Sequence, residues 1–336
     1  MLSFGVKVRS ALVATLVTTL AAALAGATLI AAAPAHAQNF PSSSVKLIVP
    51  VPAGGVTDTM ARIVAQRLTE MWGQPVVVDN RPGGNYGIGA QAVSRSPPDG
   101  YTLLVAPDST FTANPALIAK INYDPKEFTP IKVLCRASPV LVVNSAVAAG
   151  SVKELIALAK SQPGKLNYGS YGIGTYAHLS MEDFKQRTGT DIVHIPYRGA
   201  APAANGLLAG DVGMLLLNLS SIEAHEQTGK VRILAAATEK RLATRPDLPT
   251  ISEAGVPGFA TSVWFALWGP PNMPQELVAK IHADVGKALD LPASRDYFKT
   301  NSLERVDLSP AQFSELIQSD LKHWSALINA VGARIE

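Results

Sequence analysis

The segment at residues 45–62 constrains the fold more than any other part of this sequence. Its apolar run at residues 45–51 is typical of a buried strand, which the Pro-Ala-Gly-Gly turn at residues 52–55 ends. An amphipathic helix is predicted directly after the turn, at residues 57–72. A helix that begins after a glycine turn presents unpaired N–H groups and the positive end of its dipole. We therefore predict an anion site, for a small carboxylate more than a triphosphate because the lysine of a nucleotide P-loop is missing.

Strand and helix signals alternate along the rest of the chain. Strands are expected at residues 45–51, 75–79, 101–106, 166–170, 192–197, 212–217, 231–238 and 262–269. Helices are expected at residues 57–72, 87–95, 151–161, 174–188, 201–208, 221–228, 274–291 and 309–331. Runs of β-branched residues separated by helical patterns predict an α/β fold with doubly wound parallel sheets and helices on both faces. The apolar stripe of the last helix is expected to be packing surface.

The chain is too long for one small core, and two domains are expected. We predict a discontinuous domain I at residues 38–140 and 263–336, and domain II at residues 141–262. Two strands crossing between the domains would form a hinge. Because ligands of open α/β sheets bind at the carboxyl ends of strands, we expect a ligand cleft between the domains.

Residues 1–37 are predicted to be a cleaved signal peptide. Lys7 and Arg9 precede a long uncharged stretch, and residues 35–37 (Ala-His-Ala) place small residues where a signal peptidase reads. The alternative is an uncleaved membrane anchor, because the apolar run is longer than a usual signal core, but Gly26 and Pro34 interrupt it. We expect export to the periplasm.

Charge and cysteine content exclude several function classes. Without Lys7 and Arg9, 27 of the 29 basic residues face 26 acidic ones, so neither nucleic acid nor a membrane surface is indicated as a partner. Cys135 is the single cysteine and lies in an apolar context typical of a buried thiol. The sequence has no His or Cys spacing typical of a metal site, so we expect no metal and no cofactor.

A second glycine-rich turn, at residues 167–175, also follows a strand and begins a helix. Ser170 and Thr175 can add hydroxyl donors to its free N–H groups, and each charge-assisted hydrogen bond contributes about 1.5–3 kcal/mol. Facing each other across the cleft, the two turns could hold a desolvated carboxylate without an arginine. The alternative is that both are ordinary strand-to-helix turns capped by Thr57 and Thr175.

A third glycine-rich segment, at residues 81–89, supports a competing hypothesis. Its G-x-G-x-x-A pattern from Gly87 resembles a dinucleotide fingerprint, with Asp108 near the expected ribose-binding acid. The fingerprint needs its first glycine directly after the strand, whereas residues 80–86 intervene here. Export would also separate the chain from the usual cofactor pool, so an NAD enzyme is the weaker interpretation.

The strand at residues 192–197 is followed directly by Arg198. Arg198 could contact the far end of an anionic ligand, with Tyr197 lining the cleft, or it could be a solvated surface charge. His178, one helical turn beyond the second glycine-rich turn, is expected to be structural. Because neither a nucleophile–base pair nor a Gly-x-Ser-x-Gly elbow is apparent, we predict no catalytic residue and no enzyme activity.

Together these segments resemble the Bug (TctC-like) family, the periplasmic solute receptors of tripartite tricarboxylate transporters. The most specific segment is Ile-Val-Pro-Val-Pro-Ala-Gly-Gly-Val-Thr-Asp. The matching segments run in order over nearly the whole mature chain, at residues 48–58, 80–83, 98–104, 114–115, 167–178, 194–199 and 248–255. The resemblance implies a two-domain class II periplasmic-binding fold that closes on its ligand, with membrane permease subunits as partners.

The resemblance also implies that the first and second turns hold a carboxylate, partly through ordered water. These binding roles are carried onto Ala53, Gly54, Gly55, Thr57, Asp58, Ser170 and Thr175. Near a carboxylate, Asp58 would bond the loop or a water more readily than the anion itself.

Two departures from the family pattern bear on selectivity. The family often has Gly-Gly-Asn-Ile-Gly after Arg-Pro-Gly, where this chain has Tyr86-Gly87 in place of the Gly-Asn pair. The family often has Asp-Asn after the strand at residues 212–217, where this chain has Leu217-Asn218. Both changes could favour an aromatic or less polar acid, with Tyr86, Phe111 and Leu217 as the candidate lining.

The sequence therefore predicts a monomeric solute-binding protein that captures a small organic acid and delivers it to a permease. The acid would be a di- or tricarboxylate or an aromatic carboxylate. Closure would be a rigid-body hinge motion, and binding must favour the closed state through contacts such as the second turn and Arg198. A ligand sensor for a signalling partner and, less favoured, an exported enzyme are the alternatives.

Overall fold

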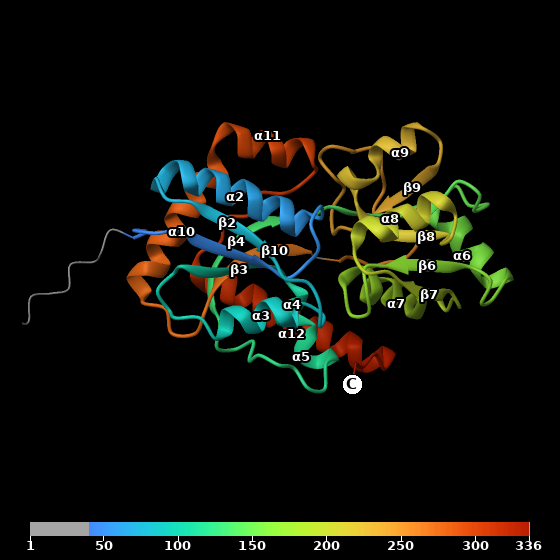
Figure 1. Ribbon diagram of the computed structural model, residues 1–336. Helices are drawn as coiled ribbons and strands as arrows, with labels where there is room; N and C mark the ends of the chain where they lie inside the picture. The colour runs from blue at the N-terminus through green and yellow to red at the C-terminus, as the bar shows by residue number, and fades with distance from the viewer. Residues whose placement is uncertain (1–39, 262, 336) are drawn as a thin grey trace, which may run out of the picture. The chain divides into compact units, whose positions relative to one another are not determined.

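The computed structural model describes residues 40–261 and 263–335 (Figure 1). Ser43–Glu336 forms one compact unit, which contains both sheets and all the helices described below. The predicted signal peptide at residues 1–37 lies outside the described residues. None of the helices in the described part of the chain is long and apolar enough to cross a membrane.

The first sheet has five strands in the order β2-β1-β3-β10-β4. Its strands are β1 (Val45–Val49), β2 (Val76–Asn80), β3 (Thr102–Pro107), β4 (Thr129–Arg136) and β10 (Trp264–Gly269). Strand β1 lies parallel to β2 and β3, whereas β10 runs antiparallel to β3 and β4. The carboxyl ends of β1, β2 and β3 therefore meet at one edge of this sheet.

The second sheet also has five strands, in the order β7-β6-β8-β5-β9. Its strands are β5 (Pro139–Asn144), β6 (Asn167–Ser170), β7 (Val193–Pro196), β8 (Met214–Asn218) and β9 (Val231–Ala236). Strand β6 lies parallel to β7 and β8, and β5 runs antiparallel to β8 and β9. The second glycine-rich turn follows the carboxyl end of β6.

Helices connect the strands of both sheets. Those up to β5 are α2 (Val56–Trp72), α3 (Gly87–Ser94), α4 (Ser109–Thr112) and α5 (Asn114–Leu117). Those up to β9 are α6 (Val152–Ser161), α7 (Tyr176–Thr188), α8 (Ala200–Ala209), the 3₁₀ turn η1 (Leu219–Ser221) and α9 (Glu223–Gln227). After β10 come α10 (Gln275–Asp290), α11 (Pro292–Thr300) and α12 (Pro310–Val331).

Each sheet packs on its own hydrophobic core, and α12 connects the two halves of the unit. Phe313 of α12 packs in the aromatic core of the first sheet. Further along α12, Trp324 and Ile328 share a cluster with Leu117 of α5 and Leu179 of α7. The prediction that the stripe on the last helix is packing surface is confirmed.

The α/β architecture is confirmed, but each sheet also contains antiparallel pairs, where parallel sheets were expected. Strands β10 and β5 run antiparallel to their neighbours because the chain passes from one sheet to the other near each of them. Strand β4 was not predicted, and the residues of β5 were expected only as part of a strand that crosses between the domains. The short polar helix α11 was also missed. The domain limits at residues 140 and 263 stay a prediction.

Candidate functional site

The first glycine-rich turn leaves the carboxyl end of β1 and opens helix α2. Pro52, Ala53 and Gly54 are exposed, and a Cβ atom on Gly54 or Gly55 would meet no atom within 4 Å. Gly54 has φ 98°, a left-handed conformation that favours glycine. Gly55 is the N-cap of α2 and supplies no side-chain cap, so the first N–H groups of α2 have no intrahelical partner.

Asp58 holds this turn from within the helix. Its carboxylate accepts a 3.0 Å hydrogen bond from the Gly54 N–H and two from the Arg62 guanidinium, at 3.0 and 2.9 Å. Asn80 Nδ2 donates to the same carboxylate at 2.9 Å and to the Val51 carbonyl at 3.1 Å. Burial alone would raise the pKa of Asp58, but the hydrogen bonds from Arg62, Asn80 and Gly54 outweigh it and lower that pKa.

The second glycine-rich turn uses its hydroxyl groups to hold its own backbone. Thr175 Oγ1 donates to the Gly172 carbonyl at 2.8 Å and does not cap α7. Ser170 is 0% exposed, and its Oγ accepts from the Gly172 N–H at 3.2 Å. Both hydroxyls were expected to be donors for a ligand. In the structure they are engaged with Gly172, and the N–H groups of Gly172, Gly174 and Thr175 are bonded as well.

Two stacked histidines lie against this turn. His178 Nδ1 accepts from the Gly174 N–H at 3.1 Å, so this atom carries no proton. His194 Nε2 lies 2.6 Å from Ser170 Oγ, and the two imidazole centroids are 4.3 Å apart. Burial lowers the pKa of His178, and burial together with the charge of His178 lowers the pKa of His194 to about 4. Both rings are therefore neutral at pH 7.

The Ser170–His194 pair corrects the expectation that the chain has no nucleophile–base pair. Sequence reasoning missed it because the two residues come from neighbouring strands, β6 and the edge strand β7. The side chain of Ser170 is fully buried and already bonded to Gly172. The pair therefore shapes the turn and does not present an attacking oxygen to a substrate.

Two contacts join segments of the first sheet to turns of the second. A Cβ atom on Gly174 would lie 1.9 Å from Leu117 Cδ2 and 3.1 Å from Asn85 Nδ2, so only glycine fits here. A Cβ atom on Gly199 would lie 3.8 Å from Pro52 Cγ. The turn that carries the exposed Arg198 is thus a neighbour of the first glycine-rich turn.

Tyr86 stands in a strained and well-braced loop. Asn85 and Tyr86 have φ 50° and 75°, which only a few per cent of non-glycine residues adopt. Asn114 braces the loop: its Oδ1 accepts from Asn85 Nδ2 at 2.9 Å, and its Nδ2 donates to the Asn85 carbonyl at 2.7 Å. Backbone strain that is held this firmly is typical of functional sites.

The ring of Tyr86 lies among polar groups from both sheets. Burial raises the pKa of Tyr86, and the nearby Asp108 carboxyl adds to the rise, while a hydrogen bond with the Ser109 side chain opposes it. Tyr86 in turn contributes to the raised pKa values of Tyr171 and Tyr176, which flank the second turn. The rings of Tyr171 and Tyr176 are in edge-to-face contact, with centroids 5.5 Å apart, and Tyr86 acts on both electrostatically from the first-sheet side.

Phe111 and Leu217 were expected to line the cleft. The structure buries both, each at 2% exposure. The ring of Phe111 stacks on Trp268 with centroids 3.8 Å apart, and Leu217 packs in the core beneath the second sheet. Tyr197 is half-buried beside helix α8. Of the residues proposed for selectivity, Arg198 is exposed and Tyr86 is half-buried.

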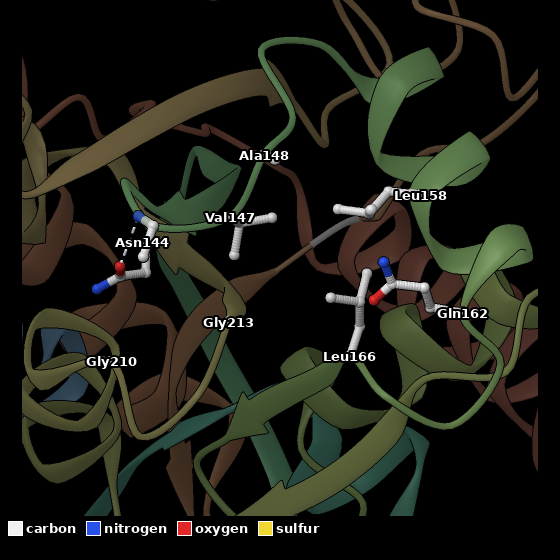
Figure 2. A pocket seen from close by; sticks show the side chains of 9 residues that line it. Asn144, Val147, Ala148, Leu158, Gln162, Leu166, Gly210 and Gly213 are labelled. Carbon is white, nitrogen blue, oxygen red and sulfur yellow. Dashed lines mark hydrogen bonds between the residues drawn. The ribbon is translucent and has the colours of Figure 1, made fainter.

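A pocket of about 300 Å³ lies elsewhere, beside the loop between β5 and α6 (Figure 2). Its nine lining residues include Asn144, Val147, Leu158 and Gln162, and none of the nine is charged. The Asn144 amide is already engaged, donating to the Leu207 carbonyl at 2.7 Å and accepting from the Ala146 N–H at 2.9 Å. This lining is poorly suited to an anion. Across the described residues, no cluster of His, Cys, Asp or Glu could hold a metal ion.

Comparison with known proteins identifies the family. The model of the tripartite tricarboxylate transporter family receptor (TctC) matches residues 60–333. The chain belongs to this family. It is 34% identical over 307 residues to protein BugT of Bordetella pertussis, covering 91% of this chain and 94% of BugT. The resemblance predicted from the glycine-rich turns is thereby confirmed.

Solved structures of TctC-like proteins share the fold. Rpa4515 of R. palustris, solved with adipate, has a TM-score of 0.83 and 34% identity, with 87% of this chain and 98% of that chain covered. MatC of Rhodopseudomonas palustris, solved with malate, has a TM-score of 0.80 and 29% identity, with 86% and 100% covered. The two-domain periplasmic solute-binding fold is confirmed. The TctC family is a family of receptors, which leaves the NAD-enzyme interpretation without support.

Proposed function

We propose that this TctC-family protein is a periplasmic receptor that captures a small organic carboxylate and delivers it to a membrane permease. The observation that carries the proposal is the exposed first turn, which leads into α2 through an N-cap that has no side-chain hydrogen bond. Backbone N–H groups and the helix dipole at such a terminus favour an anion. The adipate and malate in the Rpa4515 and MatC structures support a carboxylate as that anion.

The paired charge of Asp58 and its hydrogen bond with Gly54 are compatible with an anion bound at this turn. A free carboxylate one turn into the helix would repel a bound anion, but Asp58 is ion-paired to Arg62 at 2.9 Å. Its hydrogen bond to Gly54 fixes the turn before the ligand arrives, so less conformational entropy is lost on binding. We assign Asp58 a positioning role, and the carboxylate contacts to the backbone of Ala53, Gly54, Gly55 and Thr57.

The second turn and Arg198 would complete the site from the other sheet. The second turn lies against Asn85 and Leu117, and the turn of Arg198 lies beside Pro52. A ligand that touches both sides stabilises the closed arrangement by the contacts it makes only there. In this account the backbone of residues 170–175 meets the ligand, while Ser170 and Thr175 hold that backbone in place.

A thermal-shift screen of protein purified from the periplasm of an expression host tests the proposal. A carboxylate at 100 times its dissociation constant adds about 2.7 kcal/mol to the stability of the folded state, which raises the melting temperature by several degrees. The screen should include malonate, succinate, malate, adipate, citrate, benzoate and the corresponding amino and hydroxy acids. The absence of a shift with every acid would contradict the proposal.

A further inference from the structure

The carboxyl group of Asp108 has a hydrogen-bonding position that the protein does not fill. Asp108 follows the last residue of β3 and is 1% exposed. Its Oδ1 accepts a 2.7 Å hydrogen bond from the Ser109 N–H. Its Oδ2 is buried and has no hydrogen-bond partner among the described residues. Such orphaned polar atoms are rare in folded proteins and are costly unless something else satisfies them.

The position of Asp108 connects it to the proposed carboxylate site. Strands β1 and β3 are parallel neighbours with Ile48 opposite Leu104, so their carboxyl ends lie at the same sheet edge. The first turn follows β1 and Asp108 follows β3. This edge is where ligands of open α/β sheets bind. A ligand anchored at the first turn can thus extend along the edge towards Asp108.

The surroundings of Asp108 are aromatic and acidic. Its charge contributes to the raised pKa of two phenols, those of Tyr86 on the first-sheet side and Tyr176 on the second. Burial raises the pKa of Asp108 well above the usual range and Asp320 of α12 adds to the rise, while the backbone groups of Ser109 and Trp264 oppose it. Asp320 itself accepts a hydrogen bond from Trp264 Nε1 at 2.6 Å. A buried carboxylate needs a cationic partner. Asp320 is acidic and the two tyrosines are neutral, so none of these three neighbours supplies one.

We propose that Asp108 Oδ2 receives the far end of the ligand, and that the ligand is a small carboxylate with a hydrogen-bond donor there, an ammonium or hydroxyl group. The inference rests on the proposed function, because it takes the carboxylate anchor at the first turn as given. A donor satisfies the orphaned oxygen, and an ammonium group also neutralises an ionised Asp108. A second carboxylate offers no donor to Asp108 in its ionised form, which is the form that an ammonium group stabilises. Only a protonated Asp108, which can itself donate, would favour a second carboxylate. This chain should therefore discriminate against plain dicarboxylates such as the adipate of Rpa4515.

Titration calorimetry with matched acids tests the inference. For chains of three to six carbons, each set contains the ω-amino acid, the ω-hydroxy acid, the unsubstituted monocarboxylate and the dicarboxylate. At the chain length that binds best, we expect the amino acid to bind about tenfold, and the hydroxy acid about threefold, more tightly than the monocarboxylate. The dicarboxylate should bind no more tightly than the monocarboxylate. A dicarboxylate that binds most tightly overturns the inference and leaves the proposed function standing.

The Asp108→Asn variant makes the test specific to one atom. It keeps the shape and an oxygen for the Ser109 N–H, but it replaces the orphaned acceptor by an NH₂ donor. The preference should reverse, with the dicarboxylate gaining at least about threefold over the amino acid. Asp296→Asn makes the same change at an exposed position of α11 and should leave the ratio unchanged. An unchanged ratio in folded Asp108→Asn protein would overturn the inference.

A melting curve shows whether Asp108→Asn folds. If it does not fold, the titrations of the wild-type protein test the inference by themselves. Binding of carboxylates without any preference between the four end groups overturns the Asp108 inference alone. If no acid of any length binds to the folded protein, the proposed function fails together with it. The two failures are therefore distinguishable in one set of titrations.

Discussion

Asp58 Oδ2 and the Gly54 N–H are 3.0 Å apart, so a side chain one turn into α2 fixes the loop that precedes the helix. The same carboxylate is bonded by Arg62 and Asn80. The first glycine-rich turn is therefore preorganised: its conformation is fixed before any ligand binds. Replacing Asp58 removes the centre of this network and leaves the half-buried amide of Asn80 and the Gly54 N–H with fewer partners.

We expect Asp58→Ala to lower the free energy of unfolding by about 1–3 kcal/mol, because the buried Asp58 carboxylate is the shared acceptor of Gly54, Arg62 and Asn80. Glu70→Ala, which breaks an exposed ion pair with Arg67 on the same helix, should cost at most about 1 kcal/mol. Urea denaturation measures both. Because the folded-state pKa of Asp58 is lowered, its contribution is present above its unfolded pKa of about 3.9 and is lost as the pH falls. Equal losses in the two variants would contradict this role.

Much of the first turn could be predicted from the sequence because its interactions are local. The strand, the glycines and the helix are adjacent in the chain, and Asp58 reaches Gly54 across four residues. The tertiary partners could not be predicted in this way. Phe111 was placed in the cleft because its partner Trp268 comes from a distant strand, β10. Ser170 meets His194 only because β6 and β7 pair.

The stacked histidines predict a pH dependence of stability. Both have lowered pKa values in the folded state, so the unfolded chain takes up protons first as the pH falls. Stability should therefore decrease from about pH 6.5, the unfolded value, towards pH 4, the folded value for His194. Glu182 and Lys185 act on both rings with opposite signs and do not remove this effect.

Thermal melts between pH 4 and 7.5 should show this decrease in the wild type. His194→Gln should flatten the curve over the same range, because it removes the group with the larger shift. His323→Gln, at an exposed position on α12, serves as the control and should follow the wild-type curve. A wild-type melting temperature that is constant from pH 6.5 to 4.5 would refute the assignment.

Gly174→Ala should weaken ligand binding by blocking the approach of the two sides. The new methyl group would lie 1.9 Å from Leu117 Cδ2, and the residue has φ 84°. Gly189→Ala, with φ 61° at the other end of α7, carries the same backbone strain with no atom within 4 Å of the methyl group. The backbone strain alone should cost each variant about 1–2 kcal/mol of stability, and the clash at residue 174 adds to this cost where the two sides are in contact.

Only Gly174→Ala should also reduce carboxylate affinity, by at least about tenfold, because a clash is costlier than strain alone. Calorimetry with the best ligand of the thermal-shift screen measures this difference. Similar affinities of the two variants would mean that the contact between Gly174 and Leu117 is not part of the bound state.

Asn114→Ala should release the strained loop at Asn85 and Tyr86. Asn114 is 0% exposed and makes two hydrogen bonds to Asn85 and one to Tyr123, so its loss should cost about 1–3 kcal/mol. Hydrogen exchange at residues 84–88 should accelerate in this variant. Asn329→Ala, exposed on α12, should change neither quantity. Unchanged exchange in Asn114→Ala would show that the loop is held by other contacts.

The N–H groups at the start of α2 are the proposed anchor, and their NMR signals test that claim most directly. The measurement is a ¹⁵N–¹H titration of the assigned protein with the tightest-binding carboxylate. The resonances of Gly55, Val56 and Thr57 should shift with saturating dependence on ligand concentration, while those of Gly210 and Gly213, in the pocket beside the loop between β5 and α6, should stay fixed. Shifts confined to Gly210 and Gly213, with the α2 resonances unmoved, would contradict this claim.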